Sequence, residues 1–542
     1  MASAAAHSRR TNPNHHLNNA GVPVTQTVTD TPVVNRFAPL VRHVHSSQSA
    51  MSEVYSPTDG QLLGEVPISS PLDVERAFHF ARLAQRRWGQ EPVYRRVQVL
   101  KRFHDLVLAN RDEALDLVQL ETGKARKDAL EEVLDICVNA RHYAKEAGRL
   151  LKPRRVRGAL PGLVGVKAYH RPKGVVGVIA PWNYPLTLAA SDALAAIVAG
   201  NAVVLKPDSK TPFTALWVAD MFERAGLPDG VLSVVAGSGA GLGPTIVGQS
   251  DFVMFTGSTG VGRVIAAGCG ERLIGCSLEL GGKNAMVILA DADIQKAVDI
   301  AIRGSFANSG QLCVSTERIY VAQQIWDDFV PALAERVKHM RLSANVGWGA
   351  DMGSLIDNGQ VETVRAHLAD AREKGATVVA GGNARPEVGP YVFEPTVLTG
   401  VTDQMQAYRN ETFGPLISLY PFATDAEAIR LANDSDYGLN ASVVTSDIKR
   451  GQAVAAQIKA GTVNVNEGYA AAWGSTSAPM GGFGDSGLGR RHGEDGILKY
   501  TESQTVATMR ALSFGPQFGM TDEKWGDLLT KSVGLMKKAG FK

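Results

Sequence analysis

The sequence predicts an α/β protein with a doubly wound, parallel sheet. Short β-branched runs alternate with helical segments, as in NAVVLKP, TALWVADMFERAG and VLSVVAG between residues 201 and 237. Strands separated by helices of about 10–15 residues are typical of βαβ units and a parallel sheet. The chain has 542 residues, enough for two or three domains, and its 56 glycines supply many tight turns.

The charge balance excludes a polyanion-binding protein. There are 56 basic and 54 acidic residues, so the net charge is +2 and no field attracts nucleic acid or an anionic membrane. No apolar run approaches the roughly 18 residues of a membrane span, and the N-terminus lacks the apolar stretch of a secretory signal. We therefore expect a cytoplasmic protein without nucleic-acid or membrane partners.

The four cysteines do not have metal-binding spacing. Cys137, Cys269, Cys276 and Cys313 form no CxxC pair and no cluster with histidines. We therefore expect reduced thiols and no bound metal. An isolated cysteine is more often a small core residue than a nucleophile, so residue type alone assigns none of them a catalytic role.

The first half of the chain begins with a polar segment and continues into helices. Residues 1–34 are rich in Ala, Asn, Ser, His and Thr, which favours a disordered tail over a transit peptide. From Pro71 to about Leu151, apolar residues three and four apart predict helices that cover a sheet. Residues 160–182 contain short β-branched runs broken by Gly and Pro, which predicts a hairpin leading to a buried strand.

The second half contains another α/β series, from about residue 283 to Gly484. It includes AMVILA, DIQKAVDIAIRGSFA, RIYVA and IWDDFVPALAERVKHM. This alternation predicts a second domain. The final stretch, LLTKSVGLMKKAG, is weakly amphipathic, which favours a docked or frayed terminal helix over a surface anchor.

A glycine-rich turn, FTGSTGVG at residues 255–262, follows a predicted strand and opens a predicted helix. Its glycines permit close approach to a phosphate, and the helix N-terminus supplies unpaired N–H groups. The spacing departs from G-x-G-x-x-G, so the turn alone fits either a phosphate-binding loop or a tight structural turn.

Two residues have the chemistry of a nucleophile and a base. Cys313 ends the segment GQLC, and Glu279 lies among apolar and small residues in LELGGK. Burial at Glu279 would raise its pKa towards the range of a general base. By residue type alone, a core cysteine and a solvated loop glutamate remain the alternatives.

Six motifs occur together in the order and spacing of aldehyde dehydrogenases. The chain resembles this family from about Ser56 to Thr505, which favours catalytic roles for Cys313 and Glu279. The motifs are PWNYP at 181–185, KP at 206–207, FTGS at 255–258, LELGGK at 278–283, GQLC at 310–313 and ETFGP at 411–415.

The resemblance implies the aldehyde dehydrogenase fold, in which a protruding hairpin, residues 153–171 here, pairs with a neighbouring subunit because a lone two-stranded ribbon is marginal in water. We therefore expect a homodimer or homotetramer. The implied parts are a Rossmann-like cofactor-binding domain (35–148 and 172–282), an α/β catalytic domain (283–484), a small β oligomerisation element (149–171 and 485–515) and a C-terminal tail (516–542).

The resemblance also implies a mechanism. Cys313 would attack the aldehyde as a thiolate, and the Asn183 amide and the Cys313 backbone N–H would hold the oxyanion. Hydride would pass to the nicotinamide, and Glu279 would activate the water that hydrolyses the thioester. A CoA-acylating relative typically lacks this glutamate, and a catalytically silent scaffold would have lost Cys313, Asn183 or Glu279, yet all three are present.

The family's cofactor would run along several of these motifs. Lys206 would bind the adenosine ribose and Glu411 the nicotinamide ribose, while Phe413 would pack near the nicotinamide and Ser258 near the pyrophosphate. The remaining cofactor positions are Trp182, Asn183, Pro207, Asp208, Ser209, Gly257 and Leu280.

Ser209 favours NADP over NAD. Family members restricted to NAD often have glutamate here, and its carboxylate binds the ribose hydroxyls and repels a 2′-phosphate. Ser209 removes that repulsion, and its hydroxyl and Lys206 would hydrogen-bond the phosphate. Asp208 adds a negative charge whose direction the sequence does not give, so NAD stays possible.

The segments around Cys313, Lys206 and Val465 most resemble bacterial enzymes assigned to succinate semialdehyde. Many of those enzymes bind the distal carboxylate with two arginines, but Ser191 and Ala307 stand at these positions here. We expect oxidation of succinate semialdehyde to succinate, without that pair of guanidinium groups.

Other residues near the expected site suit a different substrate. Tyr184, Tyr469 and Trp473 fit an apolar or aromatic aldehyde, while Ser475 and its neighbours Thr476 and Ser477 offer hydrogen-bond donors. A broad-specificity dehydrogenase for apolar or aromatic aldehydes is therefore the alternative.

Overall fold

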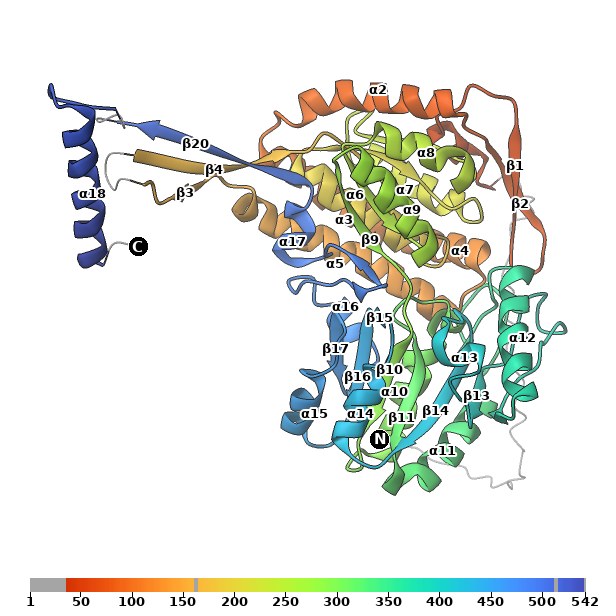
Figure 1. Ribbon diagram of the computed structural model, residues 1–542. Coiled ribbons are helices and arrows are strands. Elements are labelled where there is room, and N and C mark those ends of the chain that lie inside the picture. Colours follow the sequence, from red (N-terminus) through yellow and green to blue (C-terminus); the bar gives the residue numbers. More distant parts are fainter. Residues whose placement is uncertain (1–35, 160–163, 511–514, 541–542) are drawn as a thin grey trace, which may run out of the picture.

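The computed structural model describes residues 36–159, 164–510 and 515–540, so the predicted tail at 1–34 lies outside the described residues. Two large sheets, each with its own helices, form the body, and a long narrow arm leaves it (Figure 1). Within the described ranges, no helix combines the length and the hydropathy needed to cross a bilayer.

The first sheet has six strands in the order β19-β9-β8-β5-β6-β7, all parallel except β19. Its central strands are apolar along their whole length because both faces are covered. The strands are β5 (Val175–Ile179), β6 (Ala202–Lys206), β7 (Leu232–Val234), β8 (Phe252–Thr256), β9 (Gly275–Glu279) and β19 (Gly487–Leu488).

Helices cover this sheet on both faces, as predicted for a doubly wound fold. Val176, Val178 and Leu205 pack against α3, α5, α6 and α7, whereas the alternate residues Val175 and Val204 pack against α2, α8 and α9. The helices are α2 (Pro71–Trp88), α3 (Val93–Ala109), α4 (Arg111–Thr122), α5 (Arg126–Leu150), α6 (Pro185–Ala199), α7 (Pro212–Arg224), α8 (Gly239–Gln249) and α9 (Thr259–Glu271).

The second sheet has seven strands in the order β12-β13-β14-β11-β10-β16-β17, all parallel except β12. Its strands are β10 (Asn284–Ile288), β11 (Thr316–Ala322), β12 (Thr377–Ala380), β13 (Thr396–Thr399), β14 (Leu416–Phe422), β16 (Asn440–Val444) and β17 (Thr462–Val465). Its helices are α10 (Ile294–Phe306), α11 (Trp326–Lys338), α12 (Asn358–Glu373), α13 (Gln406–Arg409), α14 (Asp425–Ala432), α15 (Ile448–Ala455) and α16 (Ala470–Trp473).

Shorter elements complete the body. β1 and β2 form a two-stranded sheet, and β15 pairs with β18. Their bounds are β1 (Met51–Tyr55), β2 (Leu62–Pro67), β15 (Tyr437–Gly438) and β18 (Phe483–Gly484), and the 3-10 turns are η1 (Ala38–His43), η2 (Ala307–Gly310) and η3 (Gln323–Ile325).

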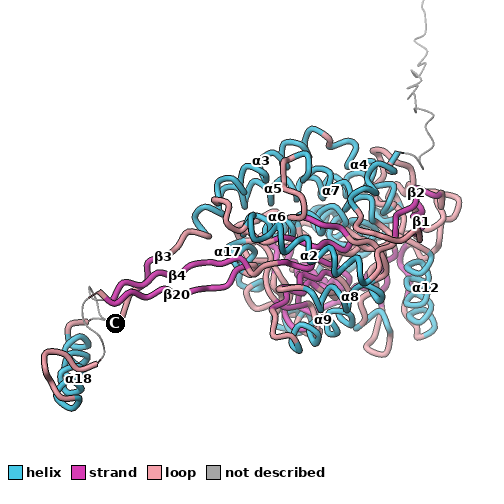
Figure 2. The backbone as a smooth tube through the Cα atoms, turned by 90° about the horizontal axis from the view of Figure 1, so that it is seen from above, coloured by secondary structure: helices cyan, strands magenta, loops and turns pink. Residues whose placement is uncertain are grey.

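The arm is a three-stranded antiparallel sheet that projects from the body (Figure 2). The predicted hairpin supplies β3 (Arg154–Val156) and β4 (Val164–Pro172), and β20 (Thr501–Met509) adds a third strand. At its far end lies α18 (Asp522–Lys538), so the predicted C-terminal tail contains a regular helix.

One part of the predicted oligomerisation element does not lie in the arm. β19 pairs with β9 in the six-stranded sheet, and α17 (Gly493–Leu498) packs on α5 and α6. The backbone pairing of Gly487–Leu488 and the helix contacts of Gly493–Leu498 therefore lie in the body, and only β20 of residues 485–510 lies in the arm.

The loop before Cys313 has an unusual backbone. Asn308, Ser309 and Gly310 are consecutive residues with positive φ, at 49°, 57° and 73°. Side-chain bonds hold the turn, since Ser309 Oγ donates to Gly353 O at 3.0 Å and Asn308 Nδ2 donates to Gln311 O at 3.0 Å. At Gly310 a Cβ atom would lie 2.2 Å from Gly414 O, so this position has no room for a side chain.

We predict that Gly310→Ala lowers the thermal unfolding midpoint. The left-handed backbone and the clash with Gly414 O should together cost about 2 kcal/mol or more, since overpacking alone costs about 1–3 kcal/mol. Gly270→Ala is the matched control, because Gly270 lies in α9 and a Cβ atom added there would have nothing within 4 Å; it should leave the midpoint unchanged or raise it. Equal midpoints for the two variants would contradict the assigned strain.

Candidate active site

Four parallel strands deliver the predicted residues to one edge of the six-stranded sheet. β5 ends before Trp182 and Asn183, β6 ends at Lys206, β8 ends before Gly257, and β9 ends at Glu279. In open α/β sheets, ligands bind at the carboxyl ends of the strands. The topology therefore brings together residues up to a hundred positions apart in the sequence.

Cys313 follows the left-handed turn and packs against an apolar cluster that contains Tyr184, Leu312 and Tyr469. Asn284 Nδ2 fixes its backbone by donating to Cys313 O at 2.8 Å. Burial, and then the charges of Glu279 and Glu411, raise the pKa of the Cys313 thiol to about 12. The thiol is therefore protonated at neutral pH until a base or a positive charge acts on it.

The other cysteines have different surroundings. Cys137 is buried, and desolvation raises its pKa to about 12. Cys269 and Cys276 are neighbours across the turn between α9 and β9, and a hydrogen bond from Cys269 lowers the pKa of Cys276 to about 7. Cys276 is thus the more acidic thiol, but it lies at the start of β9, the opposite end from Glu279.

Hydrogen bonds fix both the side chain and the backbone of Asn183. Its side-chain Nδ2 donates to Gln311 O at 3.0 Å, and its backbone oxygen accepts from Lys124 Nζ at 2.6 Å and Asn308 Nδ2 at 2.9 Å. The amide therefore lies beside the loop that carries Cys313, and it is buried. A fixed amide donor of this kind suits an oxyanion.

A fully buried ion pair supports Asn183. Lys124 Nζ lies 2.6 Å from Glu132 Oε1, and neither side chain is exposed. The other oxygen of Glu132 accepts the backbone N–H groups of Leu186 and Thr187 at 2.8 and 3.1 Å, at the start of α6. Neither charged residue was predicted from the sequence. Glu132 on the buried face of a predicted helix was a signal, whereas Lys124 lies between two helices.

Glu279 is buried and incompletely paired. Its Oε1 has no hydrogen-bond partner among the described residues, and a Cβ on Gly481 would lie 3.2 Å from it. Burial raises the pKa of Glu279 to about 7, although the charges of Arg491 and Lys499 oppose this. A carboxylate with a pKa near the working pH is suited to general base catalysis.

Glu411 is bound to the LELGGK segment, and Phe413 packs against Trp182. Glu411 Oε1 accepts from Gly282 N at 2.7 Å, and a Cβ on Gly281 would lie 2.3 Å from Glu411 Oε2. Burial raises the pKa of Glu411 to about 8. The Phe413 ring meets the Trp182 ring edge to face, with centroids 5.5 Å apart. The approach of Glu411 requires glycine at 281, and the approach of Cys313 O, 2.6 Å from a Cβ on Gly282, requires glycine at 282.

The glycine turn has the features of a phosphate site. Gly257 N donates to Glu279 O at 3.0 Å, and Ser258 is an exposed N-cap of α9 whose hydroxyl does not cap the helix. Leu280 packs on the first turn, because a Cβ on Gly262 would lie 2.5 Å from Leu280 Cδ2. An uncapped helix N-terminus with glycines suits a pyrophosphate.

The segment after β6 lines a separate cavity of about 280 Å³. Lys206 is buried, which lowers its pKa, and its Nζ donates to Pro207 O at 2.8 Å. Asp208 Oδ1 accepts the backbone N–H of Lys210 at 3.0 Å, and Ser209 is exposed. The cavity is lined by Ser52, Val54, Val66, Pro67, Ile68, Pro207, Asp208, Ser209, Pro212, Ala236, Gly237 and Ser238. The residues present fit a dinucleotide, with Ser209 at this cavity and Ser258 at the helix end.

Aromatic side chains gather beside Cys313. The Trp473 ring lies 5.3 Å from that of Tyr184 and 5.8 Å from that of Tyr469, between centroids. Acidic groups of α5 anchor two of them, because Trp473 Nε1 donates to Asp135 Oδ1 at 2.6 Å and Tyr469 Oη donates to Glu131 Oε2 at 2.9 Å. The surroundings of the thiol are therefore aromatic and acidic.

Two hydroxyls near the expected substrate site already donate hydrogen bonds within the protein. Ser475 is exposed, and its Oγ donates to Ala471 O at 2.7 Å. Ser191 Oγ donates to Asp135 Oδ2 at 3.0 Å. Arg303, on α10, forms an ion pair with Glu467 at 2.9 Å, just before Tyr469. It is the guanidinium nearest in sequence to Ala307.

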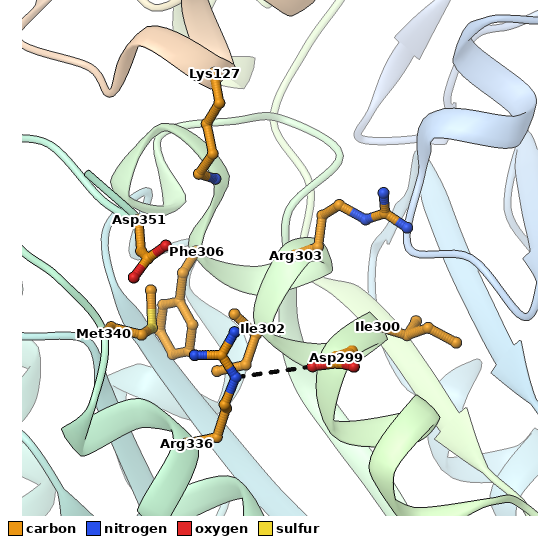
Figure 3. A pocket seen from close by; sticks show the side chains of 9 residues that line it. All are labelled: Lys127, Asp299, Ile300, Ile302, Arg303, Phe306, Arg336, Met340 and Asp351. Carbon is orange, nitrogen blue, oxygen red and sulfur yellow. Dashed lines mark ion pairs between the residues drawn. The ribbon is translucent and has the colours of Figure 1, made fainter. Parts of the chain in front are cut away.

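Two other features do not contain the predicted site residues. A pocket of about 280 Å³ beside α10 and α11 is lined by Lys127, Asp299, Ile300, Ile302, Arg303, Phe306, Arg336, Met340 and Asp351 (Figure 3). His43, Asp220 and Glu223 bring ligand atoms within 4.8 Å of one another, but Arg42 already pairs with both carboxylates, at 2.8 and 2.9 Å.

Known proteins resemble this chain over most of its length. A relative from Mycolicibacterium smegmatis, with the provisional name succinate-semialdehyde dehydrogenase (NADP+), is 53% identical and covers 88% of this chain and 93% of its own. The 4,4'-diapolycopene aldehyde oxidase of a Methylomonas species is 37% identical, with 84% and 85% covered.

Solved structures have the same fold. An aldehyde dehydrogenase from Bacillus cereus superposes with a TM-score of 0.83 at 34% identity, covering 86% of this chain and 95% of its own. A betaine aldehyde dehydrogenase from Staphylococcus aureus, in complex with NAD+, gives 0.83 at 32% identity, with 90% and 99% covered. The family model of the aldehyde dehydrogenases matches residues 43–506. The chain therefore belongs to the aldehyde dehydrogenase family.

Proposed function

We propose that this protein oxidises an aldehyde to a carboxylic acid through a thioester on Cys313, with NADP as its preferred cofactor. The observation that carries the proposal is that three groups lie close together at the carboxyl edge of the six-stranded sheet: a nucleophile, an amide donor, and a carboxylate whose pKa is near neutral pH. These are Cys313, Asn183 and Glu279. When bound, the nicotinamide would accept the hydride.

Cys313, Asn183 and Glu279 act in successive steps of this proposal. The Cys313 sulfur attacks the carbonyl carbon, and its proton passes to solvent, either directly or through Glu279, which releases it before deacylation. Asn183 Nδ2 and the Cys313 N–H stabilise the oxyanion. After hydride loss, Glu279 removes a proton from water, and the hydroxide displaces the sulfur to give the acid and the free thiol.

Succinate semialdehyde is the proposed substrate, because the mycobacterial relative is named for it and is 53% identical. The aromatic cluster favours a second candidate, an apolar or aromatic aldehyde, since Tyr184, Tyr469 and Trp473 lie beside the thiol. The Methylomonas relative is named for an aldehyde of that kind. If the substrate is succinate semialdehyde, Arg303 is the cation whose interaction with the distal carboxylate should be tested.

We also propose a cytoplasmic homodimer or homotetramer. The arm extends from the body and exposes Val506 and Met509 on β20. A second subunit would cover such apolar side chains. The predicted division into cofactor, catalytic and oligomerisation parts remains part of this proposal.

We predict that Cys313 and Glu279 act in different halves of the reaction. Cys313→Ala should abolish even the first turnover, because no thioester can form. Glu279→Gln keeps the side-chain size but removes the base, so it should release up to one equivalent of reduced cofactor per site and then stall. Stopped-flow absorbance of the reduced nicotinamide measures both outcomes. Undiminished steady-state turnover by Glu279→Gln would contradict the proposal, whereas loss of its burst would mean that Glu279 also activates the thiol.

We predict that NADP is used more efficiently than NAD. Ser209 adds no carboxylate to the cavity after β6, and the carboxylate of Asp208, which also lines the cavity, accepts a hydrogen bond from the backbone of its own loop. Ser209→Glu should reverse the preference by repelling the 2′-phosphate. The measurement is kcat/KM for both cofactors, with Ser209→Ala as the uncharged control. A wild-type preference for NAD of tenfold, about 1.4 kcal/mol, would show that this loop is wrongly interpreted.

We predict modest selectivity for succinate semialdehyde over an uncharged aldehyde of similar length. Neither Ser191 nor Ala307 supplies a guanidinium, and buried bidentate arginine contacts discriminate more strongly than hydroxyl donors. Comparison of kcat/KM for the two aldehydes tests this, in wild type and in Arg303→Ala. A preference of a thousandfold or more would require another cation in the pocket, and its loss in Arg303→Ala would identify Arg303.

A further inference from the structure

A cluster of buried, charged side chains lies near Glu279. Arg491 Nη2 donates to Asp192 Oδ2 at 2.5 Å and to Thr256 Oγ1 at 2.8 Å, and Lys499 Nζ lies 3.9 Å from Asp192 Oδ1. The side chains of Arg491, Asp192 and Lys499 are only 10%, 6% and 11% exposed. Burying three charges is costly, and no step proposed above uses them.

The sheet register places this group on the face from which Glu279 projects. Thr256 pairs with Glu279, and Met254 pairs with Ser277, across the neighbouring strands β8 and β9. Residues two apart on a strand share a face, and cross-strand partners have adjacent side chains. Lys499 Nζ lies 3.4 Å from Met254 Sδ and 3.3 Å from Ser277 Oγ.

Arg491 is also fixed through its backbone. Arg491 and Met480 exchange two backbone hydrogen bonds, at 2.6 and 2.9 Å, and Gly481 is the residue whose Cβ would approach Glu279 Oε1. Arg491 Nε and Glu279 Oε1 both lack a hydrogen-bond partner among the described residues. An unpaired buried donor and an unpaired buried acceptor thus remain in one cluster.

We propose that Arg491 is a positioning residue for Glu279: anchored by Asp192 and Thr256, its charge keeps the buried carboxylate ionised, and Asp192 limits the strength of that effect. The inference rests on the proposed role of Glu279 as the base. Burial would otherwise neutralise the carboxylate at the pH where it must accept a proton.

The electrostatics agree with this arrangement. Burial raises the pKa of Glu279 to about 7, Arg491 is the largest influence that lowers it, and Asp192 raises it. Arg491 also lowers the pKa of the Cys313 thiol. The charged or titratable groups that face Glu279 are Arg490 and Arg491 after β19, Lys499 after α17, Asp192 on α6 and Cys313 after η2. Tyr500 and, on α5, Tyr143 face Asp192.

Removal of Arg491 and removal of Asp192 should therefore shift the pKa of Glu279 in opposite directions. Arg491→Met removes the charge that favours the carboxylate and leaves Asp192 to repel it, so the pKa of Glu279 should rise. Asp192→Asn removes the repulsion and leaves Arg491, so the pKa should fall. In Asp192→Asn/Arg491→Met both influences are gone, and the value should return towards that of the wild type. Lost packing alone would not produce opposite shifts.

The test is the pH dependence of acyl-enzyme hydrolysis in single turnovers, measured for wild type, the two single variants and the double variant. The acid limb should move up by about one pH unit in Arg491→Met and down in Asp192→Asn. Arg491→Lys keeps the charge and should stay closer to the wild type than Arg491→Met. Infrared difference titration of the Glu279 carboxyl, assigned against Glu279→Gln, gives the same pKa without turnover.

The outcomes separate the inference from the proposed function. If Glu279→Gln stalls as an acyl-enzyme but both single variants shift the midpoint in the same direction, or not at all, the role of Arg491 is wrong and that of Glu279 stands. If Glu279→Gln hydrolyses its thioester normally, the role of Glu279 itself fails. Where Arg491→Met does not fold, Asp192→Asn alone decides, because an unchanged or raised infrared pKa in that variant overturns the inference.

Discussion

Three acidic groups, Glu279, Glu411 and Cys313, lie close to one another between the six-stranded and seven-stranded sheets. Glu279 is buried and the other two are partly buried, and loss of water raises the pKa of each. This desolvation brings Glu279 to a pKa of about 7, where a carboxylate can accept and release a proton at neutral pH. It also holds the Cys313 thiol protonated. The chemistry of the site therefore depends on how the surrounding charges oppose burial.

Two buried cations, Lys124 and Arg491, lie near the reacting groups, and Arg491 opposes the effect of burial on the pKa of Glu279. Lys124, paired with Glu132, fixes the backbone of Asn183, and Arg491, paired with Asp192, donates to Thr256, the cross-strand neighbour of Glu279. A buried pair adds little net stability, since both charges lose their water, but removing one partner leaves an uncompensated charge. Such pairs are better explained by the precise placement of their neighbours than by stability.

The sequence predicted those parts of the site that depend on local pattern. The strand ends at Lys206 and Thr256 follow apolar runs, and the helix after Ser258 follows a glycine turn, so the α/β class and these residues at the sheet edge could be predicted. The strand that ends at Glu279 was not predicted. The resemblance supplied the roles of Cys313 and Asn183. The family assignment agrees with the match over residues 43–506.

Contacts between distant segments could not be predicted in this way. Arg491 and Asp192 are 299 residues apart in the sequence, and the ion pair depends on the backbone bridge to Met480 and the pairing of β19 with β9. Ser475 was expected near the substrate because it has a hydroxyl, but a hydrogen bond to Ala471 O four residues earlier already uses its proton. The residue type shows which hydrogen bonds a side chain can form, and the tertiary structure determines which of them it does form.

The central claim is that the acyl group is carried by Cys313 and released by Glu279. The most direct measurement is mass spectrometry of Glu279→Gln, quenched in acid after mixing with aldehyde and cofactor and then digested. The account predicts one acyl group per subunit, on the peptide that contains Cys313. An adduct on Cys276, the thiol whose pKa is about 7, or on Cys269 beside it, with Cys313 unmodified, would contradict it.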